Sequence, residues 1–441
     1  MPPPIQQIFQ LDLLSWIMVS LLALLGSCVG GFSRRYMKGD SRYHKFFFDL
    51  VLLIISAAAL FCADHIALFW GAWCLSHFFL VKLMIHKPSW SAAKQSGLVA
   101  AKSLGGGALF LGIGLVLMQT ATGSWSISYL SKQSTESPSM FAGLVMFVLG
   151  VMIQSAIFPF HRWLVSSLNS PTPVSAMMHA GLVNGGGFLL LRFANLIVQE
   201  PLLLNGMFLF GILSTLFGTG WKLVQTDVKR MLAYSTVGQM GFMMAQCGLG
   251  LFPAALAHIV THGIFKAHLF LATGSSAKEK RSDLSYKMDA RTFVGSLICG
   301  FLGSLVFAVI TKKSWLSKDT TLLLLIVSWI GASQVALPLL SYQKRSMTFL
   351  AMFSSLAMSL IYGSSVRLIS HWVDPMNLMH PQSLNGLHFT AAFLLIFSWI
   401  GVLIYKHRKT KISRQLYVAL LNSSQPNSKT ITTNRNQYSY L

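Results

Sequence analysis

The chain has 441 residues, of which 54% are hydrophobic and only 10% are charged, whereas a soluble domain carries about 25% charged residues. Apolar runs of about 20 residues recur along most of the chain, and each is long enough to cross a hydrocarbon layer. These features exclude a soluble globular protein. They predict an all-α, polytopic transmembrane helix bundle, because a helix satisfies its own backbone hydrogen bonds in lipid.

Thirteen membrane spans are expected in chain order, with one transmembrane domain over 1–408 and a polar tail over 409–441. The first span follows a stretch with no basic region and no small-residue cleavage site, so we expect it to be retained. The tail has too few apolar residues to form a core and is expected to be disordered by itself. The expected spans are residues 11–32, 46–63, 65–85, 97–119, 140–158, 172–192, 205–222, 230–250, 252–273, 293–311, 321–341, 347–363 and 387–405.

The net charge of +22 could indicate nucleic-acid binding, but the basic residues follow the predicted topology. Of the 34 lysines and arginines, 27 lie in or beside odd-numbered loops or in the tail, and six lie in or beside even-numbered loops. Such a bias is the positive-inside pattern of multi-pass proteins. It predicts a protein of the cell (inner) membrane, surrounded by lipid, with the N-terminus outside and the C-terminus in the cytoplasm. No nucleic-acid partner is expected.

Two stretches in the middle of the chain break the helical pattern. Prolines at 159, 171 and 173 predict a reentrant or amphipathic connection between two spans. A second stretch holds four glycines within residues 181–187, around Asn184. It is compatible with a broken helix lining a cavity or with close helix packing. Polar side chains near these breaks could line a polar segment, and they are Gln154, His179, Asn184 and Arg192.

The clearest cluster of titratable residues lies in the span 252–273. His258, His262 and Lys266 are spaced four residues apart, which puts them on one helix face, whereas His268 lies on another face. A single membrane histidine often serves helix packing. Three titratable groups in line favour an ion or proton path, because buried charge is costly in hydrocarbon. No third metal ligand accompanies the histidines, and no catalytic motif occurs, so we expect neither a metal site nor enzymatic catalysis.

Two sequence stretches within about 154–275 resemble the antiporter-like subunits of complex I and of Mrp antiporters. The first combines Phe158–Leu164, Pro171–Ala176 and His179–Gly181; the second combines Asp227–Thr236 and Gln239–Gly241 and continues into His258, His262 and Lys266. The resemblance implies an antiporter-like core with an ion pathway. It also implies that Asp227, Lys229 and Arg230 form a cytoplasmic loop motif that a partner could contact.

Finer details are similar to the membrane subunit of the DAB (MpsAB) inorganic-carbon accumulation complexes, a NuoL-like protein. They are the residues 179–190, 243–248, 266–271 and 33–40, together with the short chain. This resemblance implies a subunit that conducts H⁺ or Na⁺ and couples ion flow to CO2 hydration. The cofactor implied is zinc, held by a cytoplasmic, carbonic-anhydrase-like partner (DabA type), with no cofactor in this chain.

The chain departs from the wider antiporter-like pattern at two positions. The early glutamate of that pattern is missing after Trp70 and Trp73, and Gln154 stands at a usual lysine position. No distal exit lysine aligns clearly, although Lys312 and Lys313 are candidates. The alternatives are a proton-pumping subunit of complex I or a related hydrogenase, an Mrp-type Na⁺/H⁺ antiporter subunit, and a scaffold that anchors a peripheral enzyme.

Overall fold

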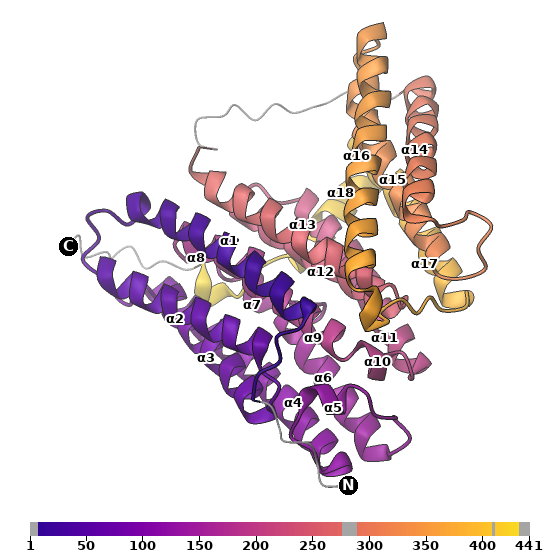
Figure 1. Cartoon of the computed structure of the whole chain (residues 1–441). Helices are drawn as coiled ribbons and strands as arrows, with labels where there is room; N and C mark the ends of the chain where they lie inside the picture. Colours follow the sequence, from indigo (N-terminus) through magenta and orange to yellow (C-terminus); the bar gives the residue numbers. More distant parts are fainter. Residues whose placement is uncertain (1–7, 276–288, 408–410, 432–441) are drawn as a thin grey trace. The chain divides into compact units, whose positions relative to one another are not determined.

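The computed structural model describes residues 8–275, 289–407 and 411–431, and these residues are mostly helical (Figure 1). The chain divides into two compact units, which are described separately below. The first comprises the described parts of residues 1–247, 258–278 and 420–441, and the second those of residues 248–257 and 279–419.

The first unit contains the helices of the N-terminal half of the chain. Its elements are α1 (Leu13–Tyr36), α2 (Tyr43–Cys62), α3 (Ile66–Met84), α4 (Ser91–Thr122), α5 (Ile127–Leu130), α6 (Pro138–Gln154), α7 (Arg162–Val165), α8 (Thr172–Met177), a π-helical turn η1 (Met178–Leu182), α9 (Asn184–Arg192), α10 (Ala194–Ile197), α11 (Pro201–Leu223), α12 (Val228–Gly248) and α13 (Phe252–Leu271) from His258 onward.

The second unit is built around three long helices and a fourth that follows them. They are α14 (Ala290–Thr311), α15 (Thr321–Leu340), α16 (Arg345–Trp372) and α17 (Gly386–His407). Within this unit, the Ser355 hydroxyl on α16 donates to the carbonyls of Cys299 on α14 and Ala332 on α15. One short polar side chain therefore joins the three helices, as is common between membrane helices.

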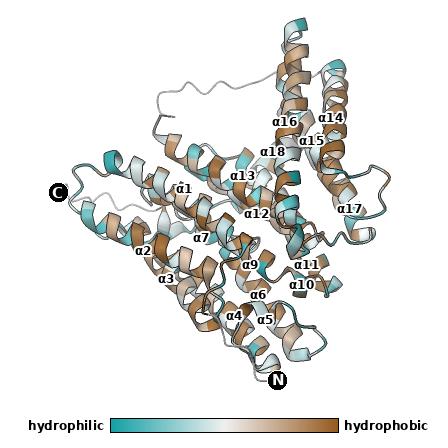
Figure 2. Ribbon diagram, in the orientation of Figure 1, coloured by the Kyte–Doolittle hydropathy of each residue, from teal (hydrophilic) through white to brown (hydrophobic). Residues whose placement is uncertain are grey.

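Eleven helical segments of the described residues are long and apolar enough to cross a membrane, which confirms the prediction of a polytopic helix bundle. Figure 2 shows hydrophobic residues along the helices of both units. Two further helices occupy predicted spans but fall outside this set: α6 has 17 residues, and α12 carries polar residues along its length. The count of thirteen spans therefore stays a prediction.

Large apolar side chains are exposed on several helices of both units. Phe48 and Ile55 on α2 are 63% and 57% exposed, and Phe353 and Ile361 on α16 are 69% and 70% exposed. A soluble protein rarely leaves so much apolar surface in contact with water. These faces suit contact with lipid.

The C-terminal segment is ordered over residues 411–431, so the expectation of disorder is wrong there. Residues Lys411–Ser423 form helix α18. The segment that follows is buried against the first unit: Tyr234 donates to the Ser424 carbonyl, and the Gln225 amide donates to the Ser424 hydroxyl over 2.9 Å. These backbone and hydroxyl contacts come from distant parts of the chain, which composition alone cannot predict. Residues 432–441 lie outside the described part.

Candidate functional site

The central segment of the first unit is one membrane-spanning stretch, Thr172–Arg192, interrupted by the π-helical turn η1. Pro173 lies in the first turn of α8, where its missing N–H costs no helical hydrogen bond. Single π-helical turns inside α-helices occur frequently at functional sites. The predicted connection before this segment contains the short helix α7, whose Trp163 is fully buried and donates to the Ile153 carbonyl over 2.9 Å.

Two of the four glycines of this segment, Gly186 and Gly187, serve close packing, which was one of the two interpretations of the sequence. A Cβ at Gly186 would lie 3.1 Å from the Val151 carbonyl of α6. The helix interruption predicted by the other interpretation is also present, at Met178–Leu182, which contains Gly181 and precedes the other three glycines. The helix pair α9 and α6 can therefore approach closely just beyond the π-helical turn.

The row His258, His262 and Lys266 lies on α13 and is buried along its length. The three side chains belong to residues that are 7%, 5% and 1% exposed, whereas His268 is exposed. The rings of His258 and His262 are stacked, with centroids 5.8 Å apart. Lys266 is five residues from the end of α13.

A chain of hydrogen bonds connects Lys266 to His179. The Lys266 ammonium donates to the Leu232 carbonyl on α12 over 3.0 Å, and the Thr236 hydroxyl donates to the same carbonyl over 3.0 Å. His179 Nδ1 lies 3.1 Å from the Thr236 oxygen. Because that hydroxyl gives its single proton to Leu232, it accepts from His179 Nδ1–H. Thr236 was not among the predicted site residues.

Asn184 connects η1 to the α13 row. Its amide nitrogen donates to the carbonyls of Ala180 and Ile259, over 2.6 and 3.3 Å, so its oxygen faces His262 Nδ1 at 3.2 Å. His262 therefore donates through Nδ1–H, and its Nε2 is the acceptor of the neutral ring. A Cβ at Gly263 would lie 2.9 Å from the Ala180 carbonyl, so glycine permits this approach of α13 to η1.

Two polar atoms along this row are buried without a protein hydrogen-bond partner. They are Nε2 of His258 and Nε2 of His262. Most buried polar atoms in proteins are hydrogen-bonded, so each exception calls for a functional explanation. In the two imidazole rings the free atom can accept a proton, which is the step that a proton path requires.

Gln154 lies beside η1 and joins it to a histidine that sequence reasoning missed. Its amide nitrogen donates to the Leu182 carbonyl over 2.8 Å, and its oxygen lies 2.7 Å from His77 Nε2 on α3. The sequence offered only the position of His77 within an apolar span as a signal. Gln154, His179 and Asn184 thus all meet η1 or its flanks, as their placement near the helix breaks suggested.

Arg192, predicted as a possible lining residue, has a structural role instead. Its guanidinium pairs with Asp12 and donates to the Ser15 hydroxyl over 2.8 Å. Asp12 also caps α1 by accepting from Ser15 N. The ion pair therefore ties the end of α9 to the start of α1, and it contacts none of the α13 row in the interactions described.

The predicted loop motif lies at the start of α12. Asp227 accepts from the backbone N–H of Arg230 over 2.7 Å, in the manner of a helix cap. Lys229 lies in the first turn of α12 rather than in a loop, and its ammonium donates to the Ser170 carbonyl over 3.2 Å. These contacts give Asp227 and Lys229 local structural roles.

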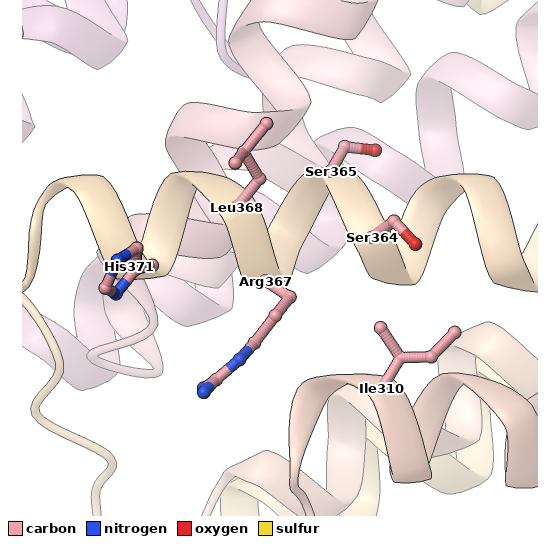
Figure 3. A pocket seen from close by; sticks show the side chains of 6 residues that line it. All are labelled: Ile310, Ser364, Ser365, Arg367, Leu368 and His371. Carbon is pink, nitrogen blue, oxygen red and sulfur yellow. The ribbon is translucent and has the colours of Figure 1, made fainter.

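The second unit has an open cavity of about 610 Å³ (Figure 3), lined by Ile310, Ser364, Ser365, Arg367, Leu368 and His371. None of the predicted pathway residues lines it. Of the candidate exit lysines, Lys313 follows α14, and burial lowers the pKa of its ammonium below the usual value.

Comparison with known families gives two matches. Residues 64–369 match the family described as NADH:quinone oxidoreductase/Mrp antiporter, TM, and residues 4–47 match the family described as NADH-Ubiquinone oxidoreductase (complex I), chain 5 N-terminus. The first match includes every predicted pathway residue.

Individual relatives agree with these matches. The chain is 31% identical over 446 residues to the "Probable inorganic carbon transporter subunit DabB" of Bacillus subtilis (strain 168), covering 96% of this chain and 84% of the relative. It is 32% identical over 322 residues to NADH-quinone oxidoreductase subunit L of Campylobacter jejuni, covering 71% and 54%. Its fold resembles a chain of the Mrp complex from Dietzia sp. DQ12-45-1b, with a TM-score of 0.65, 20% identity and coverage of 96% and 51%.

Proposed function

The chain belongs to the NADH:quinone oxidoreductase/Mrp antiporter family of membrane proteins and, within it, to the DabB-type subunits, and on this premise we propose that it conducts a cation for inorganic carbon uptake. The cation is H⁺ or Na⁺. Its flow drives CO2 hydration by a cytoplasmic partner in a two-component complex. Hydration takes place in the partner, and this chain supplies the membrane pathway.

The observation that carries the proposal is the buried polar row around η1. The Lys266 ammonium, the Thr236 hydroxyl and His179 form a hydrogen-bonded chain, and the His258 and His262 rings keep a free acceptor nitrogen beside it. Burying ionisable side chains within a membrane costs free energy, and a scaffold that only anchors an enzyme has no function that requires them. The free imidazole nitrogens favour H⁺ as the cation, because an unpartnered imidazole nitrogen can accept and release a proton.

The second component is proposed to be a zinc-containing, carbonic-anhydrase-like protein of the DabA type. Support comes from the name of the Bacillus subtilis relative, which describes one subunit of a transporter. The second candidate function is that of an ion-translocating subunit in a complex I-type or Mrp-type assembly, which the Campylobacter jejuni relative and the fold of the Mrp chain favour.

Growth of a carbonic-anhydrase-deficient bacterium in air tests the two-component proposal. We expect rescue when this chain is produced together with its soluble partner and no rescue with either alone, because the CO2-hydrating metal site is assigned to the partner. The control is the partner with the metal ligands of its own site replaced. Rescue by this chain alone would contradict the division of labour. Absence of rescue by the pair would favour the complex I-type or Mrp-type function.

We also propose that the C-terminus lies in the cytoplasm and the N-terminus outside. Contacts within the first unit support the alternation of sides. Asn169, in the loop before α8, contacts both Ser96 near the start of α4 and the Thr430 carbonyl. By the predicted spans, Ser96 and Asn169 lie in the third and fifth loops and Thr430 lies in the tail, which are all on the side predicted to be cytoplasmic. A reporter active only outside the cytoplasm, fused after Leu441, should give no signal. A strong signal would show that the C-terminus lies outside and would contradict the proposed orientation.

A further inference from the structure

His77 is a buried titratable residue that the row on α13 does not include. It lies on α3 and is 7% exposed. Its ring meets the Trp73 ring edge to face, with centroids 5.0 Å apart. Resting on the function proposed above, we propose that His77 and Gln154 form a second proton-binding station, joined through the Leu182 carbonyl to the η1 turn and the Asn184–His262 pair.

The hydrogen bonds of Gln154 determine which nitrogen of His77 can accept a proton. The Leu182 carbonyl can only accept, so the Gln154 amide nitrogen faces it and the amide oxygen faces His77. The neutral His77 ring must then donate through Nε2–H, which leaves Nδ1 as the acceptor. Nδ1 is buried and has no protein partner. His77 is thus held in the tautomer that presents a free proton acceptor, and protonation at Nδ1 preserves the hydrogen bond to Gln154.

The alternative is a histidine that serves packing alone. Such a ring normally has both nitrogens hydrogen-bonded or one of them exposed to water. His77 has neither, since its contact with Trp73 involves the ring and its one hydrogen bond uses Nε2. The arrangement repeats that of His262, whose Nδ1 faces an amide oxygen and whose Nε2 is free. Two buried histidines on different helices with one free nitrogen each favour a common role.

A cavity with charged side chains in a largely apolar lining lies close to His77 along α3. It has a volume of about 260 Å³, and its polar lining comprises Arg42, Lys45, Asp49, Lys82 and His86. Val81, which also lines it, is four residues from His77 and shares its helix face. Lys82 pairs with the buried Asp49 carboxylate over 2.6 Å, about 7.5 Å from His77 along the helix axis. Charged side chains therefore gather around the cavity at the end of α3 that carries Lys82, about one helical turn from the station.

The station reaches the α13 row through η1. Leu182 is the last residue of η1, and Asn184, which holds His262, begins α9 two residues later. This short connection places the contact of Gln154 and the residue that holds His262 on one backbone segment.

Proton flux into liposomes tests this inference, with the full chain reconstituted together with its co-purified partner. The variants are His77→Gln, which keeps a polar side chain facing Gln154 but cannot titrate, and His77→Phe, which keeps an aromatic ring beside Trp73. Both should lower the initial rate of flux under an imposed pH gradient by about 100-fold, the lower range for a positioned proton-transfer group. The control is His44→Phe, at an exposed position of α2, which should retain the wild-type rate.

The outcomes separate this inference from the proposed function. Wild-type flux in folded His77→Gln protein, judged by size-exclusion profile, would overturn the second station even if His77→Phe fails to fold. If Lys266→Met abolishes flux while both His77 variants conduct normally, the α13 row is part of the proton path and only the proposed role of His77 is wrong. If the wild-type complex passes no protons at all, the proposed proton pathway fails and the station fails with it.

Discussion

Replacing Lys266 by methionine is expected to lower cation flux and inorganic carbon uptake by at least about 100-fold, the scale of a positioned proton-transfer group. The ammonium is the one formal positive charge on the α13 row, and it donates to the Leu232 carbonyl that Thr236 also uses. A neutral, apolar side chain can neither donate or accept a proton nor repel a passing cation. The variant therefore removes the charge on which the proposed pathway depends.

Folding should survive this substitution, which makes a loss of uptake informative. Methionine keeps the length and apolar stem of lysine, and removing a poorly compensated buried charge is often neutral or stabilising. We expect normal membrane insertion and normal binding of the partner. Two controls suit the experiment: His268→Ala alters an exposed residue of the same helix, and Lys102→Met removes an exposed lysine of α4. Both substitutions should reduce uptake only slightly.

Normal uptake by Lys266→Met protein at wild-type expression would contradict the relay and assign the residue to structure. Loss of uptake in the Lys102→Met control would show instead that the assay responds to total charge. The measurement is initial uptake of labelled inorganic carbon, with membrane levels of each variant determined in parallel.

The α13 row could be predicted from sequence because its information is local. His258, His262 and Lys266 repeat every four residues within one apolar span, and helix geometry alone puts them on one face. The same holds for the polytopic bundle, which follows from apolar runs of membrane length. The helix break before Asn184 was likewise indicated by prolines and glycines close together in the chain.

Contacts between distant helices could not be predicted in this way. Gln154 and His77 are 77 positions apart, and Arg192 and Asp12 are 180 apart. Arg192 was therefore interpreted as a lining residue, because its partner lies outside any local pattern. His77 was overlooked because one histidine in an apolar span usually serves packing. Only the tertiary structure shows that one of its nitrogens is buried without a partner.

Thr236→Val is expected to lower proton flux by about 100-fold. The substitution interrupts the hydrogen-bonded chain, and the valine side chain has nearly the same shape as that of threonine. Valine replaces the hydroxyl by a methyl group, so His179 Nδ1–H loses its acceptor and the link from His179 to the Leu232 carbonyl is broken. Lys266 keeps its own hydrogen bond to that carbonyl. Thr236→Val therefore tests whether flux depends on the hydrogen bond between His179 and Thr236, whereas Lys266→Met tests whether it depends on the buried charge.

The unpaired His179 N–H also costs about 1–3 kcal/mol of stability, the usual penalty for a buried donor without a partner, so the decisive comparison is with Thr236→Ser. Serine retains the hydroxyl and should restore at least half of the wild-type flux, whereas a purely steric role would make serine and valine about equally harmful. Thr215→Val is the matched control. Its hydroxyl donates to the Gly211 carbonyl within α11, in the same manner as Thr236 but without a histidine partner. Equal flux in Thr236→Val and wild type would exclude Thr236 from the path and would leave His179 disconnected from Lys266.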